Sequence, residues 1–445
     1  MVNIGVARTS GDAGPLNFSI EAISTQVDPT WIQEVLKASG KLSRRVRKLP
    51  ADLVVQLLIA MGLHPEKSIP SVLKDLSLGF RGKLEECRDD LPTSSAITQA
   101  RDRVGAEPVE LLFERQGQEL HRRHEAQQSY KGMSVLGLDG STLKVPDTQE
   151  NRQKYGAPKS GRGRSAFPMM RVMLLLAVAA HVALAAAFGP YATGEMTLAM
   201  TLLSSIPAGS LVLFDRGFMG YLFWWQLGQK SVPFLTRAKR NVKGRRVRKL
   251  GDGDWLVRFL LPGTLKRKHP ELPESMTLRM IRYQIPGFRP SWLLTSLVDA
   301  RQYPDRELVV LYHARWELEL AFFQIKATLR LSGTPLRSEA PQRVLQEAYG
   351  ILIAYNVVRG LMADAAQAVG VPPLRLGFTD SLHRIRTAMI RMAEASAAGL
   401  LDLYAELLRE IAACRLPPRR RRHNPRVVKV KMSNYALKRV RKKAG

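Results

Sequence analysis

The spacing of apolar residues divides the chain into a helical first part, a strand-rich middle and a helical last part. Between residues 30 and 124 apolar residues recur every three or four positions, which predicts helices at 51–62, 69–78 and 108–124. From residue 134 the period is that of strands, which we expect at 134–146, as a pair within 172–188 and at 210–215, with a helix at 194–205 before the last one. The order strand, strand, strand, helix, strand predicts an α/β centre.

Residues 235–300 have a different character, because short apolar runs alternate with Gly, Pro and basic turns. This pattern predicts a β-rich insertion with strands near 254–261, 275–284 and 291–297. We interpret residues 147–167, rich in Gly, Ser, Lys and Arg, as a polar loop. After the insertion we expect helices from Asp305 onward, over 342–362 and within 372–408.

One apolar segment, Val172 to Phe188, has the composition of a membrane helix. It is slightly shorter than the ~20 residues that a spanning helix needs, and His181 lies at its centre. Two adjacent buried strands that turn near His181 explain the segment better beside its neighbours. We therefore expect no membrane partner.

The charge of the chain changes the picture more than its apolar content does. Lys and Arg number 68 against 39 Asp and Glu, which gives a net charge of +29. A polyanion is the simplest partner for such a chain, with nucleic acid first and a membrane surface as the rival. The two cysteines, Cys87 and Cys414, imply no disulfide framework and fit a reducing compartment, and the first residues lack the features of a signal peptide.

Basic residues cluster in three places, of which a helix and the tail are candidates for DNA contact. The first is Lys41–Lys48, and the last is the acid-free tail with Arg419–Arg422 and Lys438–Lys443. Between them, a helix capped by Thr93, Ser94 or Ser95 and ending at Gly105 should expose Thr98, Gln99, Arg101 and Arg103. Arg101 and Arg103 are therefore candidate DNA contacts of a helix-turn-helix type, against the alternative of a purely structural helix.

A polar stripe marks the helix that follows the insertion. Tyr312, Arg315, Glu319 and Lys326 fall within roughly 60° of one another at about 100° per residue of a helix. Glu317 points to nearly the opposite side and cannot share a site with Glu319. Alone, the stripe could be a solvated face with an ion pair between Arg315 and Glu319, worth only a few tenths of a kcal/mol.

Two further acids make a site the better interpretation. Asp139 lies within one apolar strand and Asp215 ends another, although each alone could be a turn residue or a local ion pair. Charges beside buried strands are costly unless they are paired or bound to metal. Carboxylates suit Mg²⁺, and two such ions ~3.5–4 Å apart can align an attacking water and a leaving 3′-oxygen across a phosphorus. The scattered histidines and cysteines form no zinc-like spacing, and no P-loop is present.

These residues resemble a known family. The spacing Tyr312-x₂-Arg315-x₃-Glu319-x₆-Lys326 is similar to the signature of the DDE transposases of insertion-sequence family four. Leu138-Asp139-Gly-Ser-Thr-Leu-Lys-Val-Pro-Asp147 resembles that family's first-aspartate block, and Leu213-Phe-Asp215-Arg-Gly-Phe-Met-Gly-Tyr221 resembles its second. The resemblance extends from about residue 30 to the C-terminus.

The resemblance implies Asp139, Asp215 and Glu319 as catalytic ligands of two Mg²⁺ (or Mn²⁺) ions. It implies cut-and-paste transposition, in which the freed 3′-hydroxyl forms a hairpin before the ends are joined to target DNA. Trp292, in Ser291-Trp-Leu-Leu-Thr-Ser296, would stack on a flipped base, although by sequence alone it could be a core residue. Tyr312 and Arg315 would contact the DNA backbone, and Lys326 a terminal phosphate. The partners would be double-stranded DNA, as terminal inverted repeats and target, and a second copy in a synaptic homodimer.

The implied fold is α/β: an RNase H-like core with a mixed five-stranded sheet, a β-rich insertion, a helical N-terminal DNA-binding domain and a helical, basic C-terminal region. The expected segments are a flexible lead-in (1–29), the N-terminal domain (30–130), the two parts of the core (131–235 and 301–365) around the insertion (236–300), a helical region (366–414) and a basic tail (415–445). We expect a cytoplasmic, nucleoid-associated protein of a bacterial-type cell. The alternatives are an RNase H-fold nuclease or domesticated transposase without strand transfer, and a non-catalytic DNA-binding regulator.

Overall fold

The computed structural model describes residues 21–43, 49–78, 92–124, 129–160, 163–239, 242, 244–286, 289–328, 334–393 and 395–417. None of the helices in these ranges combines the length and the apolar character that a membrane span requires. The basic cluster at 41–48 is described only to residue 43 and the basic tail only to residue 417. The predicted DNA contacts of the tail, Arg419–Arg422 and Lys438–Lys443, therefore lie outside the described residues.

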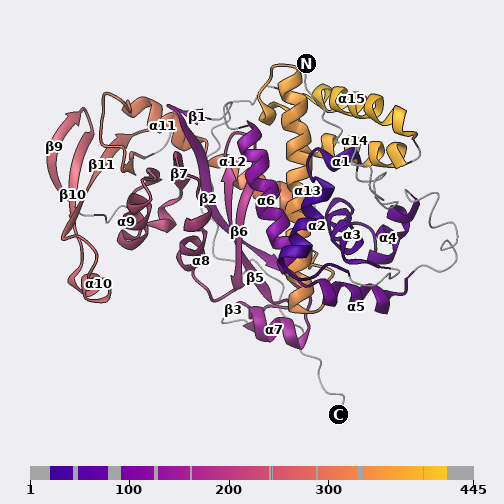
Figure 1. Ribbon diagram of the computed structural model, residues 1–445. Helices are drawn as coiled ribbons and strands as arrows, with labels where there is room; N and C mark the ends of the chain where they lie inside the picture. Colours follow the sequence, from indigo (N-terminus) through magenta and orange to yellow (C-terminus); the bar gives the residue numbers. More distant parts are fainter. Residues whose placement is uncertain are drawn as a thin grey trace, which may run out of the picture.

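A mixed sheet forms the centre of the molecule (Figure 1). Its first strands lie in the order β6–β5–β2–β7–β8, in which β5 is antiparallel to both of its neighbours while β7 is parallel to β2 and to β8. Their bounds are Met133–Lys144 (β2), Met169–Ala177 (β5), Val182–Pro190 (β6), Ser210–Phe214 (β7) and Phe234–Arg237 (β8), with the short β1 (Ser129–Tyr130) beside β2. This is the five-stranded mixed sheet expected of an RNase H-like core, and the α/β fold class is confirmed.

The insertion continues this sheet, because β12 pairs antiparallel with β8. The order runs on as β12–β11–β10–β9, each strand antiparallel to the next. The bounds are Arg245–Gly251 (β9), Asp254–Leu260 (β10), Ser275–Tyr283 (β11) and Ser291–Thr295 (β12), with helix α10 at Gly263–Lys268. The last three strands follow the prediction. The basic strand β9 was not expected, because its exposed side chains show no apolar alternation.

Helices cover both faces of the sheet, and this explains why β7 is buried along its whole length. On one face α8 (Glu195–Thr201), with the 3₁₀ turn η4 (Leu202–Ser205), and α9 (Tyr221–Gln229) pack against Leu138 and Phe214. On the other face α11 (Asp305–His313) packs Leu308 and Tyr312 against Leu213. The carboxyl ends of β2 and β7 thus lie between two hydrophobic layers.

The helices at the two ends of the chain share one core. This helical body contains α2 (Pro29–Ala38), α3 (Ala51–Leu63), α4 (Ile69–Leu78), α5 (Ser94–Val104), α6 (Glu107–His124), α13 (Pro341–Ala368), η7 (Pro373–Arg375), α14 (Phe378–Ala393) and α15 (Ala397–Ala413). Figure 1 shows α13 running beside α6, and it also packs against α3, α14 and α15. The helices α3 and α13 touch at glycines, since a Cβ on Gly62 would lie 2.7 Å from the carbonyl oxygen of Gly350.

Three local expectations have clear outcomes. Residues 172–188 form β5 and β6, with His181 in the turn at φ 58°, so the two-strand interpretation is confirmed and no helix is present there. The polar loop at 147–167 is wrong in part, because it contains α7 (Gln149–Tyr155) and the hairpin of β3 (Lys159–Ser160) and β4 (Gly163–Arg164). The flexible lead-in is too long: α1 (Glu21–Ser24) and the segment after it pack Ile23 and Val27 into the core, while residues 1–20 lie outside the described residues.

Candidate active site

Asp139 lies in the middle of β2, where the antiparallel half of the sheet meets the parallel half. Its side chain is 20% exposed, and its Oδ1 accepts a hydrogen bond from the Gly140 amide at 2.8 Å. Gly137, two residues earlier and therefore on the same face, lets α12 (Trp316–Phe323) approach the strand closely. A Cβ on Gly137 would lie 2.4 Å from Leu318 of that helix. The missing side chain therefore sets the spacing between the strand of Asp139 and the helix of Glu319.

Asp215 directly follows β7, the parallel neighbour of β2. The last paired residues of the parallel strands are Leu138 and Phe214, so each aspartate stands one position beyond this pair. Neighbouring strands are about 4.8 Å apart, which brings the two carboxylates to the same end of the sheet. The Asp215 Oδ1 accepts a hydrogen bond from the Gly217 amide at 2.6 Å and so caps the 3₁₀ turn η5 (Arg216–Phe218).

The polar stripe does not lie on one continuous α-helix. The first helix, α11, ends at His313, and α12 begins only at Trp316; the segment η6 (Gln324–Thr328) that follows is π-helical. The expectation of a single helix with regular 100° steps is therefore wrong. Tyr312 is 8% exposed, and its ring packs into the core between α11 and the sheet. Lys326 lies on the π-helical segment, where the α-helical period no longer applies.

Arg315, at the break between the two helices, connects two of the predicted acids. Its Nη2 donates a hydrogen bond to the Glu319 Oε1 at 3.1 Å, and its Nη1 lies 3.8 Å from the Asp139 Oδ2. The guanidinium also lies over the ring of Trp316, 5.7 Å from its centre. The ion pair with Glu319 that the sequence suggested is present, but the same cation also faces a carboxylate of the sheet.

The surroundings of Asp139 disfavour the ionised form of its carboxyl group. Burial raises the pKa of its carboxyl group to about 6, and the negative charges of Asp215 and Glu195 act in the same direction. The Gly140 amide and Arg315 oppose this shift. A carboxyl group with a raised pKa among other acids marks a place where additional positive charge would be stabilising.

Glu195 is an acid that the sequence analysis did not select. It is the first residue of α8 and pairs with Arg171 of β5 at 2.8 Å. Its carboxyl carbon would lie 3.2 Å from a Cβ on Gly140, which places it behind the strand of Asp139. A glutamate in the first turn of a helix is common, so the sequence offered no signal for this neighbour.

Lys326, which follows α12, contacts β2, the strand of Asp139. Its Nζ donates a hydrogen bond to the Ser141 Oγ at 2.7 Å. Ser141 lies two residues after Asp139 and therefore on the same face of β2. The structure thus gathers Asp139, Arg315, Glu319 and Lys326 around the middle of β2, beside the end of β7 where Asp215 lies.

The donor set fits a divalent cation in chemistry, because carboxylate oxygens are the ligands that Mg²⁺ prefers. As arranged, however, no three His, Cys, Asp or Glu side chains of the described ranges lie close enough together to hold an ion. The cation between Asp139 and Glu319 is the Arg315 guanidinium. The acids are therefore grouped around a positive charge that the protein itself supplies.

Trp292 lies at the start of β12, at the same end of the sheet. Its carbonyl oxygen accepts a hydrogen bond from the Ala238 amide at 2.9 Å, just beyond the end of β8. The strand of Trp292, β12, lies beyond β8, which is the parallel neighbour of β7. Trp292 is therefore two strands away from β7, the strand that Asp215 follows. The indole is half-buried, and its role in base stacking stays a prediction.

The helix expected at 93–105 is present as α5, with Thr93 as its cap and Gly105 as its end. The exposure expected of Arg101 is wrong, because this side chain is only 3% exposed. It donates to Gln346 at 3.2 Å, and to the Ser338 hydroxyl and a backbone carbonyl at 2.9 Å each. The last turn of α5 packs on α13, so this guanidinium holds the helical body together instead of facing DNA. Arg103 is exposed, and its DNA contact stays a prediction.

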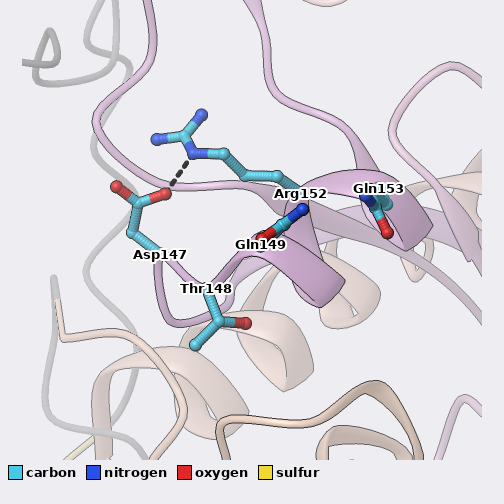
Figure 2. Close-up of a pocket in the computed structure, with 5 residues that line it drawn as sticks. All are labelled: Asp147, Thr148, Gln149, Arg152 and Gln153. Carbon is cyan, nitrogen blue, oxygen red and sulfur yellow. Dashed lines mark hydrogen bonds and ion pairs between the residues drawn. The ribbon is translucent and has the colours of Figure 1, made fainter.

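A surface pocket lies at the start of α7, and none of the predicted site residues lines it (Figure 2). Its lining consists of Asp147, Thr148, Gln149, Arg152 and Gln153. Asp147 forms an ion pair with Arg152, and the Thr148 hydroxyl donates to the Glu339 carbonyl at 2.8 Å. These contacts tie the end of the first-aspartate block to the segment before α13.

The chain is similar to known families and proteins. Residues 17–114 match the family model of the insertion element 4 transposase N-terminal region, and residues 130–357 match that of the transposase DDE domain. The chain is 30% identical over 423 residues to the transposase InsG for insertion sequence element IS4 of Escherichia coli K12, covering 94% of each. It is also 30% identical over 287 residues to InsZ of the same strain, described as a transposase, covering 60% of this chain and 91% of that protein. A piggyBac transposase synaptic complex with hairpin DNA gives a TM-score of 0.43 at 11% identity, over 87% of this chain and 85% of that one, a likeness too distant to support an argument.

Proposed function

The chain belongs to the IS4 family of DDE transposases, and from this premise we propose that it moves an insertion sequence by a cut-and-paste reaction. In this proposal it binds the terminal inverted repeats, cuts the DNA at both ends and joins the ends to target DNA. One observation carries the proposal. Asp139 in the middle of β2 and Asp215 directly after β7 each stand one position beyond the last parallel pair of these strands, and Arg315 lies between Asp139 and Glu319.

The reaction consists of successive phosphoryl transfers. Water attacks the phosphorus at the element's end, and the 3′-oxygen leaves as a hydroxyl. This hydroxyl attacks the opposite strand, which closes a hairpin and releases the flanking DNA. A second water reopens the hairpin, and the 3′-hydroxyl finally attacks target DNA and displaces a target 3′-oxygen. Each step breaks one phosphorus–oxygen bond and forms another, so no oxidant or energy source is needed.

Asp139, Asp215 and Glu319 would hold two Mg²⁺ (or Mn²⁺) ions for these steps. Such ions, when bound, activate the attacking water and stabilise the leaving oxygen. Since Arg315 now lies between Asp139 and Glu319, we propose that it turns to a DNA phosphate when the site is loaded. Lys326, held beside the site by Ser141, would bind a terminal phosphate, because an ammonium group is a suitable point charge for it.

The DNA itself would be handled by residues at the same end of the sheet. Trp292 would stack on a base flipped out for hairpin formation, with Tyr312 and Arg315 on the neighbouring backbone. Arg103 of the exposed side of α5 would contact the terminal repeat. We propose a homodimer as the synaptic form and the bacterial cytoplasm, at the nucleoid, as its place of action. A nuclease of the same fold would cut DNA without the final joining step.

The test is incubation of end-containing DNA with Mg²⁺ and either the wild type or Asp139→Asn, Asp215→Asn and Glu319→Gln. Each substitution removes one charged ligand at nearly constant volume, and we expect nicking to fall by at least 1,000-fold. Glu307→Gln, an exposed acid on α11 paired with Lys131, is the matched control and should cut normally. Nicking that survives in all three site variants would contradict the assignment of the catalytic acids.

The same assay separates the role of Trp292. Trp292→Ala should lose hairpin formation while it retains most first-strand nicking, because stacking contributes about 1–3 kcal/mol only when the base is flipped. Trp255→Ala on β10, where Arg246 and Lys249 lie over the ring, controls for the loss of a tryptophan from the insertion. Equal loss of nicking and hairpin formation in Trp292→Ala would exclude a specific base-flipping role.

A further inference from the structure

A buried polar cluster centred on Arg359 of α13 lies beneath α12. The Arg359 side chain is 2% exposed. Its Nη2 donates to the His181 Nδ1 at 2.8 Å and to the Gln324 Oε1, and its Nε donates to the Tyr355 hydroxyl at 3.3 Å. The guanidinium also lies 5.1 Å from the centre of the Phe378 ring. One side chain therefore joins the β5–β6 turn, the π-helical segment and two helices of the C-terminal part.

His181 extends this cluster to the first turn of α12. Its Nε2 lies 3.1 Å from the Glu317 Oε2. Burial lowers the pKa of His181 to about 4, and Arg359 acts in the same direction, so the ring is neutral at pH 7. A neutral ring that donates from Nε2 to the carboxylate accepts at Nδ1 from the guanidinium, and thus one tautomer satisfies both contacts.

The two anchored positions each lie just before a functional residue of this segment. Glu317 precedes Glu319 by two residues, and Gln324 precedes Lys326 by two. Gln324 is also the first residue of the π-helical segment, in which an added residue per turn changes the direction of every later side chain. A contact at Glu317 and another at Gln324 therefore define both the rotation of α12 and the start of the π turn.

We infer that Arg359 is a positioning residue of the active site, which holds Glu319 and Lys326 in place through Glu317 and Gln324. The inference rests on the proposed function in one respect, since Glu319 and Lys326 are its catalytic and DNA-binding residues. Arg359 itself is too deeply buried to reach DNA or a metal. Its geometry differs from that of a general core contact, because it reaches both ends of α12, Gln324 directly and Glu317 through His181.

Arg337 provides a matched control within the same chain. It is also an arginine paired with a buried group of α13, with its Nε 3.0 Å from the Glu347 Oε1. Its other nitrogens donate to the backbone carbonyls of Met61, His64 and Lys67 at 2.8–3.3 Å. The contacts of Arg337 thus hold α3 to α13 and do not involve α12, so its loss should weaken the fold without disturbing the signature helix.

The experiment compares Arg359→Lys with Arg337→Lys in the full chain. Hydrogen–deuterium exchange of the metal-free protein reports on residues 316–328 without any activity. We expect exchange there to rise at least fivefold in Arg359→Lys only. The Mg²⁺ concentration for half-maximal nicking should rise about tenfold, as for other residues that orient metal ligands. The Kd for end DNA should change less than the Mg²⁺ midpoint does, because Lys326 is only one of the proposed DNA contacts.

Two results would overturn the inference. One is unchanged exchange of residues 316–328 in Arg359→Lys; the other is an equal shift of the Mg²⁺ midpoint in the Arg337 control. If Arg359→Lys does not fold, Gln324→Met removes the acceptor on η6 for Arg359 and Tyr355, leaves the His181–Glu317 contact in place, and should raise exchange at 324–328 alone. A wild type that cuts no DNA would refute the proposed function, whereas the exchange result would still decide whether Arg359 holds the helix.

Discussion

A methyl group on Gly137 would test whether the contact between β2 and α12 sets the geometry of the site. In Gly137→Ala the added carbon would lie 2.4 Å from Cδ2 and 2.7 Å from Cδ1 of Leu318. Leu318 is 1% exposed and packed in the main core, so it has no free space to turn into. Carbon atoms in contact are about 3.5–4.0 Å apart, so the strand and the helix would have to separate by roughly 1 Å.

The size of the effect follows from this displacement. Overpacking of a filled core costs about 1–3 kcal/mol of unfolding free energy. The same movement changes the separation of Asp139, on the strand, and Glu319, on the helix. A misplacement of about 1 Å can lower a rate by roughly 100-fold, so first-strand nicking should fall much more than stability does.

The assay is thermal unfolding together with first-strand nicking of end-containing DNA. Leu318→Ala added to Gly137→Ala removes the clashing carbons and should restore part of both properties. Gly228→Ala in α9 is the control, since a Cβ there meets nothing within 4 Å; it should cut normally and gain about 0.5–1 kcal/mol from helix propensity. The reasoning would be refuted by a Gly137→Ala protein with wild-type stability and nicking, or by a double variant with no recovery.

Two further predictions concern pH and salt. The pKa of His181 is about 4 in the folded chain, against an ordinary value of 6.5. Between pH 6.5 and pH 4 the imidazole is therefore protonated in the unfolded chain but not in the folded one. The free energy of unfolding should fall by up to about 3 kcal/mol as the pH drops across this range. Thermal unfolding of His181→Asn, which suits the positive φ, should show a flatter pH dependence, and an unchanged profile would exclude this group as its source. For DNA binding, replacement of the exposed Arg245 and Arg248 of β9 by alanine should reduce the slope of log K against log salt by about 2, since each phosphate contact contributes about 0.9. The control is a variant in which Arg122 and Arg391, two arginines paired with glutamates, are replaced by alanine. If the salt slope of the β9 variant equals that of this control, β9 is excluded as a DNA surface.

The sequence alone was sufficient for much of the site because its signals are local. Strand periodicity predicted β2 and β7, and it showed Asp139 within the first strand and Asp215 at the end of the second. The parallel pairing of these strands puts the two acids at the same end of β7. Cap residues located both ends of α5. The separation of Glu317 from Glu319 also followed from short-range helical spacing, and the structure gives Glu317 a different partner, His181.

The remaining features depend on contacts between distant parts of the chain. The break at residues 314–315 and the π turn at Gln324 interrupt the helical period, and no residue at those positions is a helix breaker. Arg101 is polar and basic, but its neighbours from α13, more than 200 residues later, bury it. The partners of Arg359 come from four separate elements. Local periodicity determines which residues can form a helix or a strand. The packing of helices and strands against one another decides where each of them bends and which charged side chains are buried.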